Sequence, residues 1–305
     1  MGRNFGVGQR DGMRAAAAIL TEARERGGLS YSSVATLLDR YEKFHYFARS
    51  EGINRLDQVT RELVQQYAAT LRESSYSPAY QQNLLSAVNS VLSRGHEREG
   101  GRWETVSSRA EKLPSRENVR TEQTSSREQL QAAIPTMPER AAAVAELARD
   151  LGLRSKEASL LNAQAALREA ERRGIVTITE GTKGGLIREV PVTHPQQAET
   201  LERAASLQGD GRSVMPLDKN WMQFRASDLN AGREALREQN IPGYHDLRAA
   251  YAADRYQELT GHAAPCNQGG ERTAERQTDL AAREQVAREL GHGRVDVTVS
   301  YLGGR

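Results

Sequence analysis

The stretch Leu290-Gly-His-Gly-Arg-Val-Asp-Val-Thr-Val-Ser-Tyr-Leu-Gly-Gly304 places a tyrosine nine residues after a histidine. A tyrosine at such a position is, taken alone, typical of a packing residue. Two upstream segments add to its meaning, namely Gly243-Tyr-His-Asp-Leu-Arg248 and Gly152-Leu-Arg-Ser-Lys-Glu157. The basic side chains and the tyrosine of these three segments are candidate functional residues.

The length and composition indicate a globular protein of two domains. The chain has 305 residues, of which 38% are hydrophobic and 27% charged, enough for a sizeable buried core. Its single cysteine, Cys266, excludes an internal disulfide framework and fits a reducing cytosol. No apolar run reaches the roughly 20 residues of a membrane span, and the N-terminus does not resemble a signal peptide.

The charge balance does not by itself announce a nucleic-acid partner, because the net charge is only +2. Of the 42 basic residues, five are lysine and the other 37 are arginine. Arginine suits bidentate contacts with phosphate. A GC-rich genome would explain most of these arginines equally well.

The first part of the chain predicts a compact unit of four helices. Residues 11–26 are strong helix formers, apolar residues follow at helical spacing over 34–44, and Thr60 can cap a third helix. Ser77-Pro78 predicts the start of a fourth, which ends at Gly95. We expect an N-terminal helical extension over 1–30, a helical domain over 31–98 and a linker over 99–126.

The second part, residues 127–305, predicts more helices and one β-hairpin. Two β-rich runs, 175–179 and 186–192, flank the glycine-rich turn Glu180-Gly-Thr-Lys-Gly-Gly185. The expected fold class is therefore mainly α, with a helical bundle followed by a mostly helical domain that contains a small sheet. The expected helices span 127–134, 138–150, 164–173, 195–206, 218–238, 244–259 and 273–290.

Six residue types, in their order along the chain, resemble the signature of the tyrosine recombinase, or phage integrase, family. The resemblance covers roughly residues 30–305 and is strongest from 150 onward. Segment 260–277 and the endings Glu289-Leu-Gly-His292 and Tyr301-Leu-Gly303 are similar to integrases of integrative and conjugative elements and of prophages. The residues that carry the resemblance are Arg154, Lys183, His245, Arg248, His292 and Tyr301.

The resemblance implies a catalytic role for each of these residues. Tyr301 would attack the scissile phosphorus and form a 3′-phosphotyrosine, with His292 bound to the phosphate or to the nucleophile. Lys183, at the tip of the hairpin, would be the general acid for the leaving 5′-oxygen. Each residue also has a plain structural interpretation, as a core tyrosine, a structural histidine or a solvated turn lysine.

The arginines would surround the phosphate oxygens. Arg154 and Arg248 would bind them together with His245, which lies on the same helix face as Arg248. Glu157 would orient Arg154. The structural alternatives are a surface pair between Arg154 and Glu157 and an ordinary amphipathic helix start at His245.

As to partners, the resemblance implies double-stranded DNA at attachment sites. It implies a homotetramer on that DNA, with directionality or DNA-bending proteins as accessory factors, and no membrane, metal or organic cofactor. The domain over 31–98 would be a SAM-like core-binding domain and 127–305 the catalytic domain of a recombinase that integrates or excises a mobile element in the bacterial cytoplasm, associated with the nucleoid. The alternatives are a type IB topoisomerase-like nicking enzyme and a catalytically silent DNA-binding regulator.

Two departures from the family pattern lead to further expectations. Arg248 and His292 are 44 residues apart, a long spacing that we place in a surface loop over 260–277. Four residues follow Tyr301, too few for the docking helix that relatives often carry. We therefore expect Val295–Ser300 and DNA to position Tyr301, and the tail to be mobile without DNA.

Overall fold

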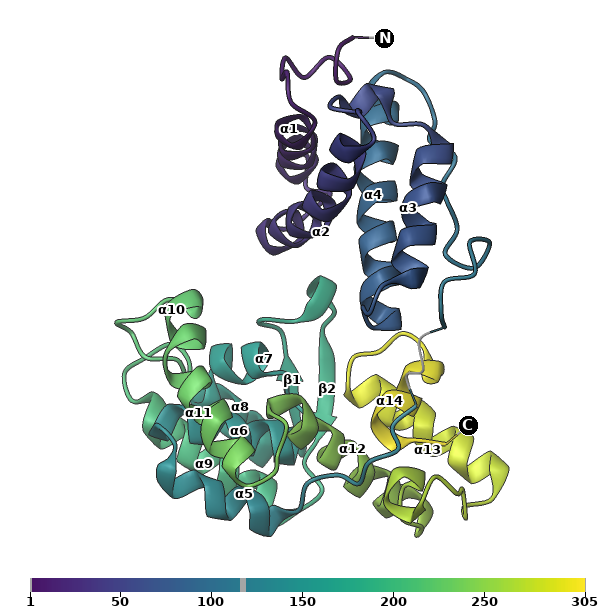
Figure 1. Ribbon diagram of the computed structural model, residues 1–305. Coiled ribbons are helices and arrows are strands. Elements are labelled where there is room, and N and C mark those ends of the chain that lie inside the picture. The colour runs from purple at the N-terminus through teal and green to yellow at the C-terminus, as the bar shows by residue number, and fades with distance from the viewer. Residues whose placement is uncertain (1, 116–118, 305) are drawn as a thin grey trace. The chain divides into compact units, whose positions relative to one another are not determined.

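The computed structural model describes residues 2–115 and 119–304, which belong to two compact units, residues 1–117 and residues 118–305 (Figure 1). Each unit has its own core of buried hydrophobic side chains. Helices dominate both, and the second unit contains a two-stranded sheet. The predicted fold class, mainly α with a small β-hairpin, is confirmed.

The first unit contains four long helices. α2 packs against both α1 and α4, and all four helices contribute to one core. The side chain of Ser77 accepts a hydrogen bond from the N–H of Tyr80 and Pro78 is the first helical residue, while Thr60 caps α3 in the same way, as the sequence predicts. The helices are α1 (Gly12–Glu25), α2 (Tyr31–Ser50), α3 (Arg61–Glu73) and α4 (Pro78–Arg98), with a 3₁₀ turn at Leu56–Gln58.

The irregular segment after α4 also packs on this unit. Trp103, Val106 and Leu113 are buried in the core of the first unit. The side-chain oxygen of Asn89 accepts hydrogen bonds of 2.9 Å from the indole N–H of Trp103 and from the backbone N–H of Val106. The boundary between the units falls within the expected linker, 99–126, but the first part of that stretch is anchored to the helices.

The second unit is a mostly helical body around an antiparallel hairpin (Figure 1). β1 (Ile175–Ile178) pairs with β2 (Arg188–Pro191), with Ile178 opposite Arg188, so the predicted hairpin is confirmed. The remaining elements are α5 (Arg127–Ala133), α6 (Glu139–Leu151), α7 (Ser155–Leu160), α8 (Ala163–Arg173), α9 (Pro195–Gln208), α10 (Trp221–Ala226), α11 (Asp228–Glu238), α12 (Tyr244–Thr260), α13 (Arg276–Glu289) and α14 (Val299–Leu302), with 3₁₀ turns at Ile134–Thr136, Lys183–Gly185, Pro265–Gln268 and Val295–Thr298.

Two segments differ from the sequence-based expectation. The helix expected over 218–238 is divided into α10 and α11, because the backbone of Ser227 leaves the helical region, with φ −100° and ψ −89°. The expected surface loop over 260–277 is partly buried. Its residues Ala264, Pro265 and Cys266 are buried, and Ala264 and Cys266 belong to the core of the second unit.

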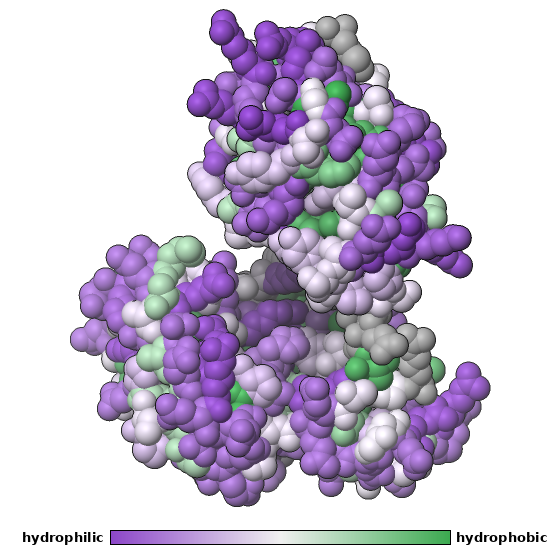
Figure 2. All heavy atoms as spheres, in the orientation of Figure 1, coloured by the Kyte–Doolittle hydropathy of each residue, from purple (hydrophilic) through white to green (hydrophobic). Residues whose placement is uncertain are grey.

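The surface of both units is mainly hydrophilic in the view of Figure 2, and the hydrophobic residues form small separate areas. Within residues 2–115 and 119–304, no helix combines the length and the apolar character that a membrane crossing requires.

Candidate active site

A glycine turn at the end of α6 sets the position of Arg154. Gly152 has φ +62°, and a Cβ there would lie 2.4 Å from the ring of Tyr251, so the turn and the close packing both require glycine. Arg154 follows as the N-cap of α7, and its backbone N–H donates to Oε2 of Glu157 at 2.7 Å. The motif Gly152–Glu157 thus folds locally into a turn that leaves the Arg154 side chain partly exposed.

The carboxylate of Glu157 lies at the centre of a buried ion cluster. Its Oε1 accepts hydrogen bonds from Arg154 Nη1 at 2.6 Å and from Arg188 Nη1 at 2.9 Å, and its Oε2 accepts one from Arg188 Nη2 at 2.6 Å. Glu157 is fully buried. Burial raises the pKa of its carboxyl, but the hydrogen bonds and charges of Arg188 and Arg154 outweigh burial and hold the pKa below its usual value. Glu157 is therefore charged at neutral pH.

Arg248 is buried beneath this cluster, with a relative exposure of 1%. It extends from the first turns of α12 and donates to the backbone carbonyls of Gly152 and Leu290. The carbonyl of Leu290 also accepts a bond of 3.5 Å from Arg154. Burial lowers the pKa of Arg248 to about 10, with Arg154 and Arg188 acting in the same direction and Tyr301 opposing them. The guanidinium thus remains protonated at neutral pH.

Tyr301 lies between the two predicted histidines. Its hydroxyl is 3.1 Å from Nε2 of His292, and its ring stacks on His245 with 5.1 Å between ring centres. The guanidinium carbon of Arg248 lies 5.7 Å from the centre of the Tyr301 ring, within the range of a cation–π contact. The structure therefore brings five of the six predicted residues together, namely Arg154, His245, Arg248, His292 and Tyr301.

Both histidines are held neutral by this surrounding. Burial lowers the pKa of His292 to about 4, assisted by the charges of Arg248, Arg154 and Arg188. Burial also lowers the pKa of His245, with Arg248 and Arg120 adding to it and Asp246 opposing. Nη2 of Arg248, which is only a donor, lies 3.5 Å from Nε2 of His292. Nε2 of His292 is therefore an acceptor, and the Tyr301 hydroxyl donates to it.

The expectation of a mobile tail is contradicted by its packing. Tyr301 is 4% exposed and Leu302 is fully buried. The thiol of Cys266 lies 3.6 Å from the carbonyl oxygen of Tyr301, and Arg283 donates to the carbonyl of Gly303 at 3.0 Å. Protein groups from remote parts of the chain, rather than Val295–Ser300 alone, thus hold the tyrosine in place.

Lys183 is the predicted residue that stands apart. It is exposed in the 3₁₀ turn Lys183–Gly185 between the two strands. Within the described part of the chain, its ammonium makes no side-chain hydrogen bond or ion pair. The structure confirms its place on the hairpin, and its catalytic role stays a prediction.

Two arginines of the site were not anticipated. Arg188 is buried and binds Glu157; the alternation of β2 offered a signal, because Arg188 shares its strand face with the buried Val190. Arg120, from the expected linker, donates to Oδ1 of Asp246 at 2.5 Å, and its backbone N–H donates to the carbonyl of Val299 at 2.9 Å. No local pattern in the sequence marks these Arg120 contacts.

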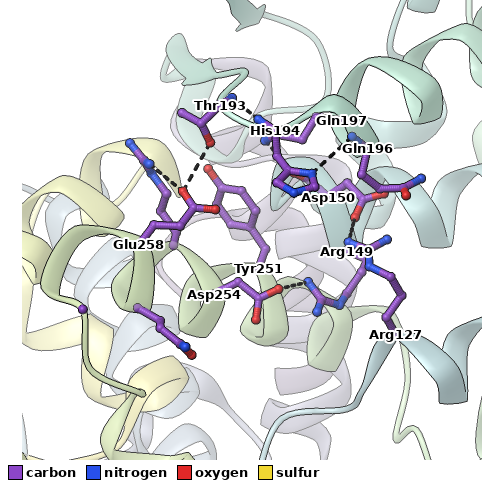
Figure 3. Close-up of a pocket in the computed structure, with 13 residues that line it drawn as sticks. Arg127, Arg149, Asp150, Thr193, His194, Gln196, Gln197, Tyr251, Asp254 and Glu258 are labelled. Atoms are coloured by element: carbon purple, nitrogen blue, oxygen red, sulfur yellow. Dashed lines mark hydrogen bonds and ion pairs between the residues drawn. The ribbon is translucent and has the colours of Figure 1, made fainter.

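A cavity of about 550 Å³ in the second unit lies outside this cluster (Figure 3). None of the six predicted residues lines it. Its charged side chains pair with one another, through Arg127 with Asp150 and Arg149 with Asp254 at 2.6 Å and Arg255 with Glu258 at 2.8 Å. The cavity therefore offers no surplus charge. Among the residues that the structure describes, no group of three or more His, Cys, Asp or Glu could hold a metal ion.

The fold and the cluster define a mainly helical domain in which arginines and neutral histidines surround a tyrosine. Residues 115–254 match the family model described as Integrase. Over these residues the chain is similar to the integrase family, and the match covers less than half of its 305 residues. A comparison with curated proteins gave no significant match.

Solved structures of recombinases have the same fold. Lambda integrase bound to DNA is similar with a TM-score of 0.62 and 14% identity, over 96% of this chain and 97% of that chain. A lambda integrase tetramer bound to a Holliday junction is similar with a TM-score of 0.59 and 14% identity, over 92% of this chain and 76% of that chain. XerH recombinase in a post-cleavage complex with palindromic difH substrate is similar with a TM-score of 0.60 and 16% identity, over 95% of this chain and 81% of that chain.

Proposed function

We propose that this protein is a site-specific DNA recombinase that cuts and rejoins strands through a phosphotyrosine at Tyr301. The observation that supports this most directly is the environment of the Tyr301 hydroxyl. It donates to a neutral His292, and the cations of Arg154 and Arg248 lie around the same backbone carbonyl, that of Leu290. Such cations stabilise both a bound phosphate and the negative charge that develops during attack.

In the proposed step, the Tyr301 oxygen attacks the scissile phosphorus. A bond forms between that oxygen and the 3′-phosphate, and the bond from phosphorus to the 5′-oxygen breaks. The phenolic proton moves to Nε2 of His292, and Lys183 donates a proton to the departing 5′-oxygen. Attack of a 5′-hydroxyl on the phosphotyrosine reverses the step, so rejoining needs no ATP and no metal.

The other roles follow from position. Arg154, a quarter exposed, would contact the non-bridging oxygens directly, with His245 beside it. Glu157 would orient Arg154. We propose that residues 127–305 are the catalytic domain, that 31–98 bind core DNA with 1–30 as an extension, and that 99–126 connect them.

The proposed partner is duplex DNA that carries an attachment site of a mobile element. The relatives solved with DNA, and the lambda integrase tetramer on a Holliday junction, support a proposal of four copies acting on two duplexes. Accessory directionality or DNA-bending proteins, an origin in an integrative or prophage element and action in the bacterial cytoplasm belong to the same proposal.

Covalent trapping on a suicide substrate tests the function. Binding sites are first selected by the protein from random duplexes, and each selected duplex is then nicked a few nucleotides 3′ of candidate cleavage positions. Cleavage releases a short 5′-hydroxyl strand that diffuses away, so a 3′-linked protein–DNA adduct accumulates and is seen on a denaturing gel. The wild-type chain should form the adduct, and Tyr301→Phe should bind the same duplex without forming it.

The matched control is Tyr46→Phe, which changes a tyrosine that is 59% exposed in the first unit and should leave the adduct unchanged. An adduct that persists in Tyr301→Phe would show that another residue is the nucleophile. Relaxation of supercoiled plasmids that lack any selected site would instead favour the topoisomerase-like alternative.

A further inference from the structure

Arg188 makes more contacts with buried polar groups of the site than its place in a β-strand requires. It is 4% exposed at its side chain and gives Glu157 two hydrogen bonds, of 2.6 and 2.9 Å. Its Nε donates to the backbone carbonyl of Glu289 at 2.8 Å. Arg188 thus joins β2 to α7 and to the end of α13.

Without Arg188, the negative charge of Glu157 would be paired only by Arg154 and Arg248, the arginines proposed to face the phosphate. With Arg188 present, one carboxylate is shared by Arg154 and Arg188, and Arg248 stays 3.8 Å from Oε2 of Glu157. Without Arg188, two hydrogen bonds to a fully buried carboxylate would be lost. A buried carboxylate that loses a partner is costly, so it would attract Arg154 and Arg248 more closely.

Arg188 also sets the base of the hairpin that carries Lys183. It is the first residue of β2 and lies opposite Ile178, the last residue of β1. The turn that contains Lys183 therefore begins and ends at this pair. A Cβ at Gly291 would lie 3.0 Å from Cδ of Arg188, so the chain that leads to His292 passes closely over the same side chain.

We propose that Arg188 is a positioning residue for strand cleavage. It neutralises Glu157, so that the charges of Arg154 and Arg248 stay available to the phosphate, and it fixes the hairpin that carries Lys183. This inference rests on the proposed function, because its effect is on the cleavage step. Arg188 itself touches no reacting atom in this scheme and acts through Glu157 and the hairpin.

The test measures single-turnover adduct formation on the suicide duplex at saturating protein, together with DNA affinity and thermal unfolding. Arg188→Met keeps an unbranched apolar side chain and removes the guanidinium and its charge. It should slow adduct formation by roughly 10–100-fold, as loss of an outer-shell partner typically does, with DNA affinity within about threefold. Arg188→Lys keeps the charge without the two parallel bonds and should fall between Arg188→Met and the wild type.

A second substitution separates positioning from a merely structural role. Glu157→Gln in the Arg188→Met background removes the unpaired charge and should recover about half of the lost rate on a logarithmic scale. The rate defect of Arg188→Met relative to the wild type should likewise shrink as the pH falls below 7, because the Glu157 pKa rises once Arg188 no longer opposes its burial, and protonation then removes the same charge. Arg149→Met, at a side chain 7% exposed and paired with Asp254, is the burial-matched control and should cleave at the wild-type rate.

The outcomes are distinguishable. A wild-type chain that forms no adduct overturns the proposed function and this inference with it. A wild-type adduct combined with an undiminished rate in Arg188→Met overturns the inference alone. A rate loss that Arg149→Met reproduces, or that Glu157→Gln deepens rather than relieves, also overturns it. If Arg188→Met does not fold, Arg188→Lys and its combination with Glu157→Gln decide by the same rates.

Discussion

The hydroxyl of Tyr301 lies 3.1 Å from Nε2 of His292. The imidazole is neutral, and this nitrogen is its acceptor because it also faces the donor Nη2 of Arg248. Burial and three nearby arginines lower the pKa of His292 to about 4. The same cations that would attract a phosphate therefore also keep this histidine free to take a proton. In the proposed mechanism, one set of charges would thus serve both phosphate binding and the activation of Tyr301.

We predict that His292 titrates far below an ordinary histidine. Its neutral form is favoured in the folded protein, so its contribution to stability is present above pH 6.5 and is lost as the pH falls from 6.5 towards 4, where only the unfolded chain takes up the proton. NMR titration of labelled histidines, with His292→Gln for assignment, checks the midpoint. A midpoint near 6.5 in the folded protein would contradict the prediction.

His292→Ala, which lacks an acceptor for the Tyr301 proton, should slow cleavage about 100-fold or more.

For Lys183, we predict a variant that is stable and catalytically slow. The side chain is exposed and unpaired within the described residues, so Lys183→Ala should change the free energy of unfolding by less than about 0.5 kcal/mol. Adduct formation should fall by about 10²–10⁴-fold if the lysine is the general acid.

A substrate with sulfur in place of the leaving 5′-oxygen provides the specific readout. A thiolate leaves without needing a proton because its pKa is far below that of an alcohol, so this substrate should restore most of the Lys183→Ala rate. Lys43→Ala, at an exposed lysine of the first unit, is the control and should cleave both substrates at the wild-type rates. Equal defects of Lys183→Ala on the oxygen and sulfur substrates would exclude a general-acid role.

Local signals in the sequence were sufficient for most of the fold. Ser77 and Pro78 mark the start of α4 because serine capping and proline at the first helical position act within one turn. The glycine-rich turn around Lys183 between two β-rich runs marks the hairpin in the same local manner. The break at Ser227 was not predicted, because the helical periodicity of the sequence continues across the point where the backbone leaves the helical conformation.

The parts that escaped prediction depend on contacts between remote residues. The packing of the tail depends on Cys266, Arg283 and Arg120, which lie far from Tyr301 in the sequence. The family resemblance named the residues of the site, but not the buried Arg188 that shares the Glu157 carboxylate with Arg154. Ionic partners across distant segments leave no periodic pattern to read.

Arg154 and Arg248, the two arginines proposed to bind the phosphate, differ in burial, so we predict that their substitution destabilises the fold to different extents. Arg248 is 1% exposed and bonded to two backbone carbonyls, whereas the side chain of Arg154 is 25% exposed. Arg248→Ala should lower the free energy of unfolding by about 3–5 kcal/mol, the range for a broken buried charge interaction. Arg154→Ala should lower it clearly less. Urea unfolding measures the difference, while both variants should lose adduct formation. Equal stability losses would contradict this use of burial.

The last prediction concerns Gly303, which fixes the packed tail. Its backbone has φ +67° and ψ −175°, a region that glycine adopts and other residues enter at a cost of about 1–3 kcal/mol. A Cβ there would also lie 2.5 Å from the carbonyl oxygen of Arg120 and 3.0 Å from the backbone nitrogen of Cys266. Gly303→Ala should therefore displace the tail, and with it Tyr301, and slow adduct formation at least about tenfold.

Cys266 reports this displacement directly, because it is the only cysteine of the chain and is 1% exposed. Burial raises the pKa of its thiol, with Arg120 opposing, so alkylation of the native protein should be slow. Gly303→Ala should accelerate it as the tail leaves the thiol. Gly293→Ala, where a Cβ would meet no atom within 4 Å, is the matched control and should react as slowly as the wild type. Slow alkylation together with slow cleavage in Gly303→Ala would place the defect somewhere other than in the tail.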